Sequence, residues 1–405
     1  ALTLTDSVTR AGDTLGPDHP STLASRNNLA GAYRDAGRLD EAIALYEQIL
    51  EDRTRILGPH HPSTLTSRNN LAYAYQDAGR LNDAITLYEQ NLKDLEGLLG
   101  PDHPDTLTSR HNLAYAYQDA GRLNDAITLY EQNLKDLEGL LGPDHPHTLQ
   151  ARNNLASAYR AAGRLDEAIT LHEQNLKDLE GLLGPDHPHT LQARNNLASA
   201  YRAAGRLDEA ITLHEQNLKD LEGLLGPDHP HTLQARNNLA SAYRAAGRLD
   251  EAITLYEQTL TDRTRILGPH HPDTLTSRNN LASAYRDAGR LDEAIALHEQ
   301  NLIDLTHILG PHHPNTLTSR NNLASAYRDA GRLDEAIALH EQNLIDLTHI
   351  LGPHHPNTLT SRNNLAKAYR AAGRFEDADK LFETPSGSED EQDGTEEDPA
   401  QEAGD

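Results

Sequence analysis

Apolar residues between Ser21 and Gly37 recur at the spacing of an α-helix. Leu23, Leu29 and Tyr33 are the largest of them, and polar residues lie between. An apolar face with this spacing predicts a first helix. Gly37 follows it and suits the left-handed conformation in which many helices end.

A second apolar stripe starts at Leu39 and predicts a second helix of about five turns. Asp40 and Glu41 lie at its beginning, where negative charge interacts favourably with the helix dipole. Gly58 and Pro59 end it, because proline cannot continue a helix. The residues of this stripe are Leu39, Ala42, Ile43, Tyr46, Ile49, Leu50, Arg53, Ile56 and Leu57.

The two-helix pattern repeats every 42 residues, and residues 143–184 and 185–226 are identical. A fixed period of this length is typical of one elongated array of stacked repeats, in which each repeat contacts its neighbours. Ala30 and Ala42 are alanine in nearly every repeat, so we expect the helices to approach closely there. The chain starts within a second helix, and we therefore expect it to be a fragment or a processed form of a longer protein.

The formal net charge is −26, which argues against a nucleic-acid partner because phosphate binding needs a basic surface. There is no cysteine, so disulfides and thiol chemistry are excluded. No apolar run approaches 18 residues and no signal peptide is visible, so we expect a cytoplasmic protein without a membrane partner.

Composition changes sharply at Pro385. Residues 385–405 carry nine acidic residues and no basic one, without apolar periodicity. This composition predicts a disordered tail. Two roles remain open for it: a solubilising tail, or a segment that occupies a basic groove of the protein.

The run N-L-A-x-A-Y-x-x-A-G-R-L-D-E-A-I-x-L-x-E-Q resembles the tetratricopeptide repeat. The spacing and the connector L-G-P-x-H-P are similar to the kinesin light chain subtype and to bacterial tandem arrays. The resemblance implies an all-α fold, a right-handed superhelical solenoid of stacked antiparallel helix pairs. We expect a partial repeat with only a second helix at 1–16, eight repeats at 17–352, a terminal partial repeat at 353–384 and the tail at 385–405.

The resemblance also implies a non-catalytic scaffold that binds protein or peptide in a concave groove lined by the first helices. Asparagine amides would hydrogen-bond the peptide backbone, since each has a donor and an acceptor. Alternatively, these amides tie neighbouring helices together or face solvent. The asparagines at the matching positions are Asn28, Asn70, Asn112, Asn154, Asn196, Asn238, Asn280, Asn322 and Asn364.

Two further rows would face the groove. Tyr73 and Tyr115 offer apolar surface, whereas an arginine row suits a carboxylate through paired hydrogen bonds. The alternative for the arginines is an ion pair with a nearby aspartate such as Asp329. Arg38 and its equivalents follow a helix C-terminus and are interpreted as structural. The groove arginines are Arg160, Arg202, Arg244, Arg286 and Arg328.

Histidine is abundant, with 23 residues, many of them in the connectors. Paired imidazoles such as His60 and His61 could bind a metal, but no connector supplies a third ligand, so we expect neither metal nor cofactor. Either His61 or Ser63 caps the next helix. The histidines at the Tyr46 position are expected to pack in the core: His172, His214, His298 and His340.

No set of unlike catalytic groups converges in the repeat, so we expect no enzyme activity and no catalytic residues. The expected partner is a protein or an extended peptide, including an acidic one. A second hypothesis is a structural or self-assembly module, because near-identical repeats can pair with themselves. A third is the sensor arm of a nucleotide-dependent signalling protein whose upstream domain is absent.

Overall fold

The computed structural model describes residues 2–353 and 355–382, and these contain 19 helices and no strand. The predicted all-α fold of stacked helix pairs is confirmed. The first helices of the repeats are α2 (Pro20–Asp35), α4 (Pro62–Asp77), α6 (Pro104–Asp119), α8 (Pro146–Ala161), α10 (Pro188–Ala203), α12 (Pro230–Ala245), α14 (Pro272–Asp287), α16 (Pro314–Asp329) and α18 (Pro356–Ala371).

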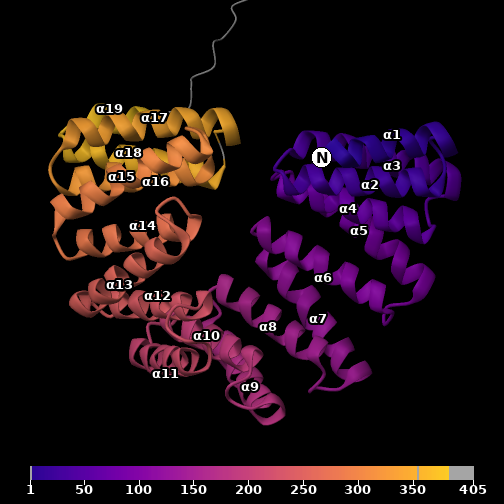
Figure 1. Ribbon diagram of the computed structural model, residues 1–405, viewed down its shortest axis with the longest axis horizontal. Coiled ribbons are helices and arrows are strands. Elements are labelled where there is room, and N and C mark those ends of the chain that lie inside the picture. The colour runs from indigo at the N-terminus through magenta and orange to yellow at the C-terminus, as the bar shows by residue number, and fades with distance from the viewer. Residues whose placement is uncertain (1, 354, 383–405) are drawn as a thin grey trace, which may run out of the picture. The chain divides into compact units, whose positions relative to one another are not determined.

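The second helices alternate with them along the chain (Figure 1). They are α1 (Leu2–Leu15), α3 (Leu39–Leu57), α5 (Leu81–Leu99), α7 (Leu123–Leu141), α9 (Leu165–Leu183), α11 (Leu207–Leu225), α13 (Leu249–Leu267), α15 (Leu291–Leu309), α17 (Leu333–Leu351) and α19 (Phe375–Lys380). The predicted tail at 385–405 lies outside the described residues.

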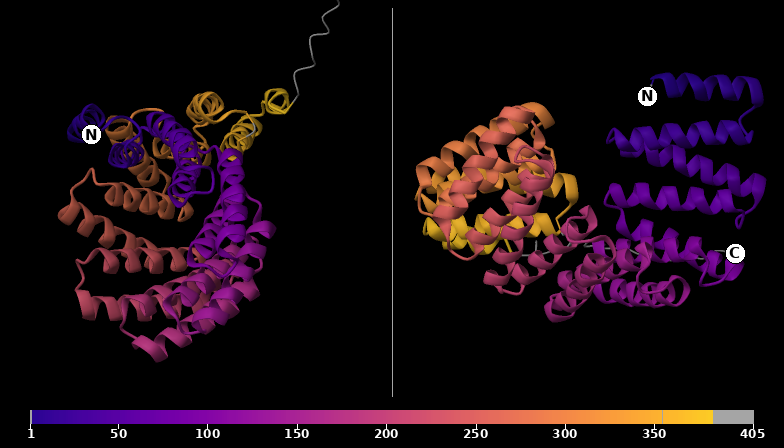
Figure 2. Two further views of the ribbon diagram at one scale, coloured as in Figure 1. Left: turned by 90° about the vertical axis from the view of Figure 1, so that its right-hand side faces the viewer. Right: turned by 60° about the horizontal axis from the view of Figure 1, so that its bottom comes forward.

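The chain divides into two compact units, residues 1–247 and 248–405. Within each unit, every helix packs against the next one in sequence, as Figure 2 shows for the indigo to magenta helices of the first unit. Successive first helices also contact each other, as α8 and α10 do in the first unit and α16 and α18 in the second. In each unit the first helices thus form one continuous surface, called here the first-helix face.

A histidine caps the N-terminus of every repeat's first helix. In the second repeat, His61 Nδ1 accepts a hydrogen bond from the Ser63 backbone N–H at 3.1 Å, with Pro62 at the first helical position. Of the two caps that the sequence left open, the histidine is therefore the one used. The Thr64 hydroxyl donates to the Gly58 carbonyl at 2.9 Å and thereby fixes the connector. Gly58 has a φ of 90°, which favours glycine.

The small residues lie where the helices approach most closely. Ala30 and Ala42 are fully buried (0% exposed), as are Ala72 and Ala84 in the next repeat. A larger side chain at these positions would force the helices apart, which explains why alanine recurs there. The expectation of close helix approach is confirmed.

Two contacts repeated along the chain join the second helices to the first. Arg68 on α4 pairs with Asp94 on α5 at 2.6 Å, within one repeat. Tyr75 on α4 donates its hydroxyl hydrogen to Glu47 on α3 at 2.6 Å, between repeats. Arg80 covers the same tyrosine, with its guanidinium 4.1 Å from the ring centroid. The arginines after the glycine thus stack on tyrosine at the turn between the helices.

Candidate functional site

The asparagine row of the first helices forms hydrogen bonds between repeats. Asn70 Nδ2 donates to Asn27 Oδ1 of the preceding repeat at 3.0 Å. One nitrogen of the amide thereby ties neighbouring helices together, which is one of the alternatives that the sequence left open. The same bond, at 2.7–2.9 Å, links Asn112 to Asn69, Asn196 to Asn153, Asn238 to Asn195, Asn322 to Asn279 and Asn364 to Asn321.

These asparagines remain at the surface of the first-helix face. Asn28 is exposed, and the other eight of the row, Asn280 included, are half-buried. Asn154 lies 3.4 Å from His111, which replaces the usual asparagine partner. Binding of a peptide backbone by this row stays a prediction.

Two arginines of the predicted row lie beside an aspartate. Arg328 lies 2.8 Å from Asp329, and Arg286 lies 3.6 Å from the same carboxylate. Arg34 in the first repeat contacts Asp77 in the same way, at 3.7 Å. In the pairs Arg34–Asp77 and Arg286–Asp329 the aspartate comes 43 residues after the arginine, so these two pairs bridge consecutive first helices.

Arg160 and Arg202 differ from the rest of this row. Both are exposed, and neither forms an ion pair with any residue that the structure describes. The reason lies in the sequence, because Ala203 and Ala245 occupy the positions of the bridging aspartates. Two neighbouring helices, α8 and α10, therefore each present an uncompensated guanidinium. Arg244, the next of the row, is half-buried on α12.

Buried histidines lie behind these two arginines. His172 and His214 are each only 2% exposed, so their expected packing role is confirmed. Burial, together with the nearby charge of Arg160, lowers the pKa of His172 to about 4. Burial and Arg202 do the same to His214, so both imidazoles are neutral at pH 7.

The two predicted tyrosines lie on α4 and α6 and are accessible. Tyr73 is 41% exposed and Tyr115 is 45% exposed. The Arg34 guanidinium lies 4.7 Å from the Tyr73 ring centroid, a cation–π distance. Near the start of the chain the first-helix face thus carries aromatic surface, whereas α8 and α10 carry free positive charge.

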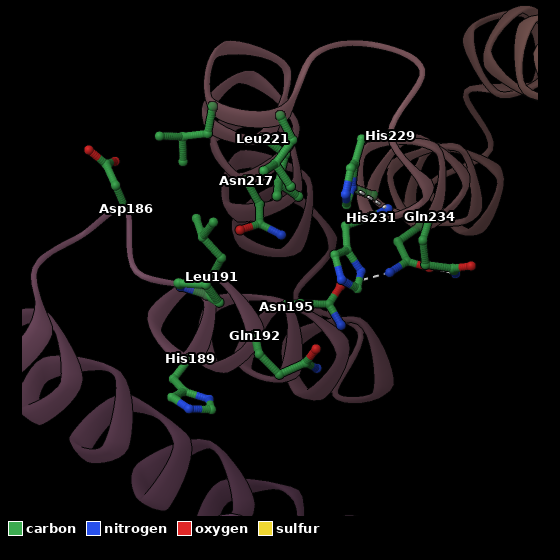
Figure 3. A pocket seen from close by; sticks show the side chains of 15 residues that line it. Asp186, His189, Leu191, Gln192, Asn195, Asn217, Leu221, His229, His231 and Gln234 are labelled. Atoms are coloured by element: carbon green, nitrogen blue, oxygen red, sulfur yellow. Dashed lines mark hydrogen bonds between the residues drawn. The ribbon is translucent and has the colours of Figure 1, made fainter.

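Hollows between consecutive first helices were missed by the sequence analysis. The hollow between α10 and α12 has a volume of about 690 Å³, and α11 contributes Asn217 and Leu221 to it (Figure 3). Leu224 and Leu225, at the end of the predicted apolar stripe, line it as well and are 49% and 45% exposed. Comparing the stripes of different repeats could have found this site, because asparagine replaces Ile49 in several of them.

No metal site emerges from residues 2–353 and 355–382, which hold no group of three or more His, Asp or Glu side chains placed to bind an ion. In the pair His60 and His61, the second histidine caps a helix and the first lies 3.5 Å from Asp94. The helices of this part of the chain include no segment with the length and hydropathy of a membrane span.

The chain is similar to several solved structures. One, from Podosopora anserina, contains nearly identical TPR-like repeats and is described as kinesin light chain. It is 36% identical in sequence, the match covers 51% of this chain and 97% of the Podosopora anserina chain, and the TM-score is 0.47. BtubC from P. vanneervenii is 25% identical, with coverage of 58% and 94% and a TM-score of 0.48. The apo quorum sensor NprR from B. thuringiensis is 14% identical, with coverage of 89% and 97% and a TM-score of 0.53, which shows a shared fold. No curated protein matches the chain.

The tetratricopeptide repeat pattern matches in overlapping segments that cover most of the chain. They are residues 4–54, 21–93, 66–135, 111–180, 147–219, 189–263, 232–302, 285–344 and 321–384. Together with the stacked helix pairs, these matches show that the chain belongs to the tetratricopeptide repeat family.

Proposed function

We propose that the first-helix face of the first unit binds an extended peptide or protein segment without catalysing a reaction. Proteins of the tetratricopeptide repeat family generally act as non-catalytic interaction scaffolds. The observation that carries the proposal is the pair Arg160 and Arg202, which are exposed and without an ion-pair partner among the described residues. Unpaired guanidinium groups on α8 and α10, helices that carry no acidic residue, favour a ligand that supplies carboxylates.

The spacing of the two arginines suggests a register for that ligand. They occupy equivalent positions on α8 and α10, helices that contact each other. Packed helices lie about 8–10 Å apart, which an extended chain spans in about three residues. A segment that crosses the first helices with an acidic residue at every third position would therefore reach both guanidinium groups.

We expect the double variant Arg160→Ala/Arg202→Ala to bind the peptide (Glu-Pro-Pro)3 at least about tenfold more weakly than the wild type. Each charge-assisted hydrogen bond contributes about 1.5–3 kcal/mol, and 1.4 kcal/mol equals a factor of ten in affinity. Fluorescence anisotropy at low salt measures the effect, because screening weakens such contacts at high salt.

The matched control for this experiment is Arg286→Ala/Arg328→Ala. These arginines occupy the same positions in the second unit and already contact Asp329. Their removal should change the affinity much less. Equal losses in the two double variants, or unchanged binding in both, would contradict the assignment of the site to α8 and α10.

A second candidate function is self-association, favoured by two exposed isoleucines. Ile303 on α15 and Ile345 on α17 are 63% and 62% exposed, at a position where four other repeats carry lysine. We expect any oligomer formed through this surface to dissociate in the variant Ile303→Lys/Ile345→Lys. Sedimentation velocity over a range of concentrations tests this, and a wild-type protein that stays monomeric at all concentrations would exclude it.

A further inference from the structure

Each hollow on the first-helix face has a buried amide as part of its lining. In the hollow between α10 and α12 this residue is Asn217, which is 3% exposed and whose Oδ1 has no hydrogen-bond partner among the described residues. Figure 3 shows its amide directed toward Leu191 and Asn195 on the opposite side of the hollow. The same unpaired carbonyl recurs in Asn91, Asn133, Asn175, Asn301 and Asn343.

An unpaired buried carbonyl destabilises the folded state, so its recurrence needs an explanation. The fold itself does not require a polar group there. The first repeat has Ile49 at this position, fully buried (0% exposed). Another repeat has Thr259, whose hydroxyl donates to the Leu255 carbonyl at 2.7 Å. An apolar or internally bonded side chain fits the site, and the asparagines therefore point to a ligand.

The hollow combines amides, leucine side chains and three histidines, His189, His229 and His231 (Figure 3). Four further amides line the hollow between α10 and α12, next to leucine side chains. Its one acidic residue is Asp186, and no lysine or arginine lines it. A carboxylate would therefore find no lysine or arginine inside to pair with. The additional amides are those of Gln192, Asn195, Gln234 and Asn238.

Three consecutive hollows of the first unit share this chemistry. Every residue that lines the hollow between α10 and α12 has an identical counterpart 42 residues earlier, in the hollow of about 600 Å³ between α8 and α10. The hollow between α6 and α8, of about 650 Å³, repeats the leucine walls and has Asn133 at the equivalent position. Identical sites at a regular pitch favour a ligand that is itself periodic.

We propose that these three hollows bind uncharged amide side chains, glutamine or asparagine, that recur along one extended segment. The inference rests on the proposed function, since the segment is the one that crosses the first-helix face. Because Oδ1 is closed to solvent, binding requires the asparagine side chain to rotate; a ligand amide can then donate a hydrogen bond to Oδ1 while its methylene groups contact the leucines. Rotation about χ2 lets an asparagine such as Asn217 present either its oxygen or its nitrogen to the ligand.

The pitch of the hollows sets the spacing of the ligand side chains. Neighbouring first helices are about 8–10 Å apart, and a polyproline II segment advances about 9 Å in three residues. In that conformation every third side chain lies on the same edge. The peptide (Glu-Gln-Pro)3 therefore presents glutamates along one edge, for Arg160 and Arg202, and glutamines along another.

The test compares (Glu-Gln-Pro)3 with (Glu-Met-Pro)3, which keeps the acidic residues and replaces each amide by an unbranched apolar side chain. We expect the glutamine peptide to bind about tenfold more tightly to the wild type, because three amides gain hydrogen bonds. The triple variant Asn133→Ile/Asn175→Ile/Asn217→Ile should lose this preference and still fold, since isoleucine is the native residue of the first repeat. Equal binding of the two peptides to the wild type would overturn the proposal.

The variant Asn301→Ile/Asn343→Ile is the matched control, because it makes the same substitution in the second unit. It should keep the preference for glutamine, and its loss there would also overturn the proposal. The two proposals can fail separately. If binding of (Glu-Pro-Pro)3 still depends on Arg160 and Arg202 while glutamine and methionine peptides bind equally, only the amide proposal is wrong. If no peptide binds at all, both are wrong.

Discussion

Lowering the pH from 7 to 5 is expected to destabilise each unit by about 2 kcal/mol for every buried histidine that it contains. The first unit holds His172 and His214, and the second holds His298 and His340, all with a pKa lowered from 6.5 to about 4. Burial is the main cause in each, followed by the charge of a nearby arginine.

The direction of the effect follows from proton uptake. Between pH 6.5 and 4 the unfolded chain binds a proton at each of these histidines, whereas the folded chain excludes it. Their contribution to stability is therefore complete above pH 6.5 and is lost as the pH falls toward 4. Urea denaturation at several pH values measures this loss as a decrease in the free energy of unfolding.

Tyrosine variants isolate the histidine contribution from that of the carboxylates. His172→Tyr and His214→Tyr restore the residue that other repeats carry as Tyr130 and Tyr256, which are 2% exposed. Each substitution should remove about 2 kcal/mol of the acid sensitivity between pH 7 and 5. An unchanged pH dependence in the double variant would show that these imidazoles do not titrate as their burial implies.

Removing the carboxylate of a buried ion pair is expected to have the largest effect of any single substitution proposed here. Arg278 on α14 and Asp304 on α15 lie 2.5 Å apart, and their side chains are 11% and 8% exposed. Asp304 also accepts a hydrogen bond from Gln300 at 2.8 Å. Asp304→Ala leaves the guanidinium buried without its partner, which costs about 3–5 kcal/mol.

Two further variants make this measurement specific. Glu293→Ala removes the partner of Arg290, whose ion pair is half exposed, and should leave stability almost unchanged. The double substitution Arg278→Met/Asp304→Leu removes both buried charges and should recover most of the lost stability. Chemical denaturation of the full chain reports all three. A loss in Asp304→Ala no larger than that in Glu293→Ala would contradict the burial of this pair.

The helices and their ends could be predicted because they depend on local sequence. Apolar spacing defined both helices, and the glycines and prolines defined their limits, as Gly58 and Pro62 show. The alanines at the helix contacts were equally visible. The choice between His61 and Ser63 as cap was not, because both side chains carry an atom that can accept a hydrogen bond from a backbone N–H at a helix start.

The functional residues depended on contacts between repeats, which apolar spacing does not reveal. In other repeats the aspartate that pairs with the arginine comes 43 residues later. Arg202 has Ala245 at that position, and its lack of a partner can be inferred only when this contact between repeats is known. The hydrogen bonds of the asparagine row could not be predicted for the same reason, since each partner belongs to the preceding repeat. The buried amides could not be predicted from the apolar stripe of the first repeat. That repeat has Ile49 at the position where most later repeats have asparagine.

The most direct test of peptide binding on the first-helix face is a crystal structure of the full chain with (Glu-Pro-Pro)3 bound. The account predicts an extended peptide that crosses α8 and α10, with glutamate carboxylates within hydrogen-bonding distance of Arg160 and Arg202. A peptide bound against the second helices, or one whose carboxylates contact neither guanidinium, would contradict it.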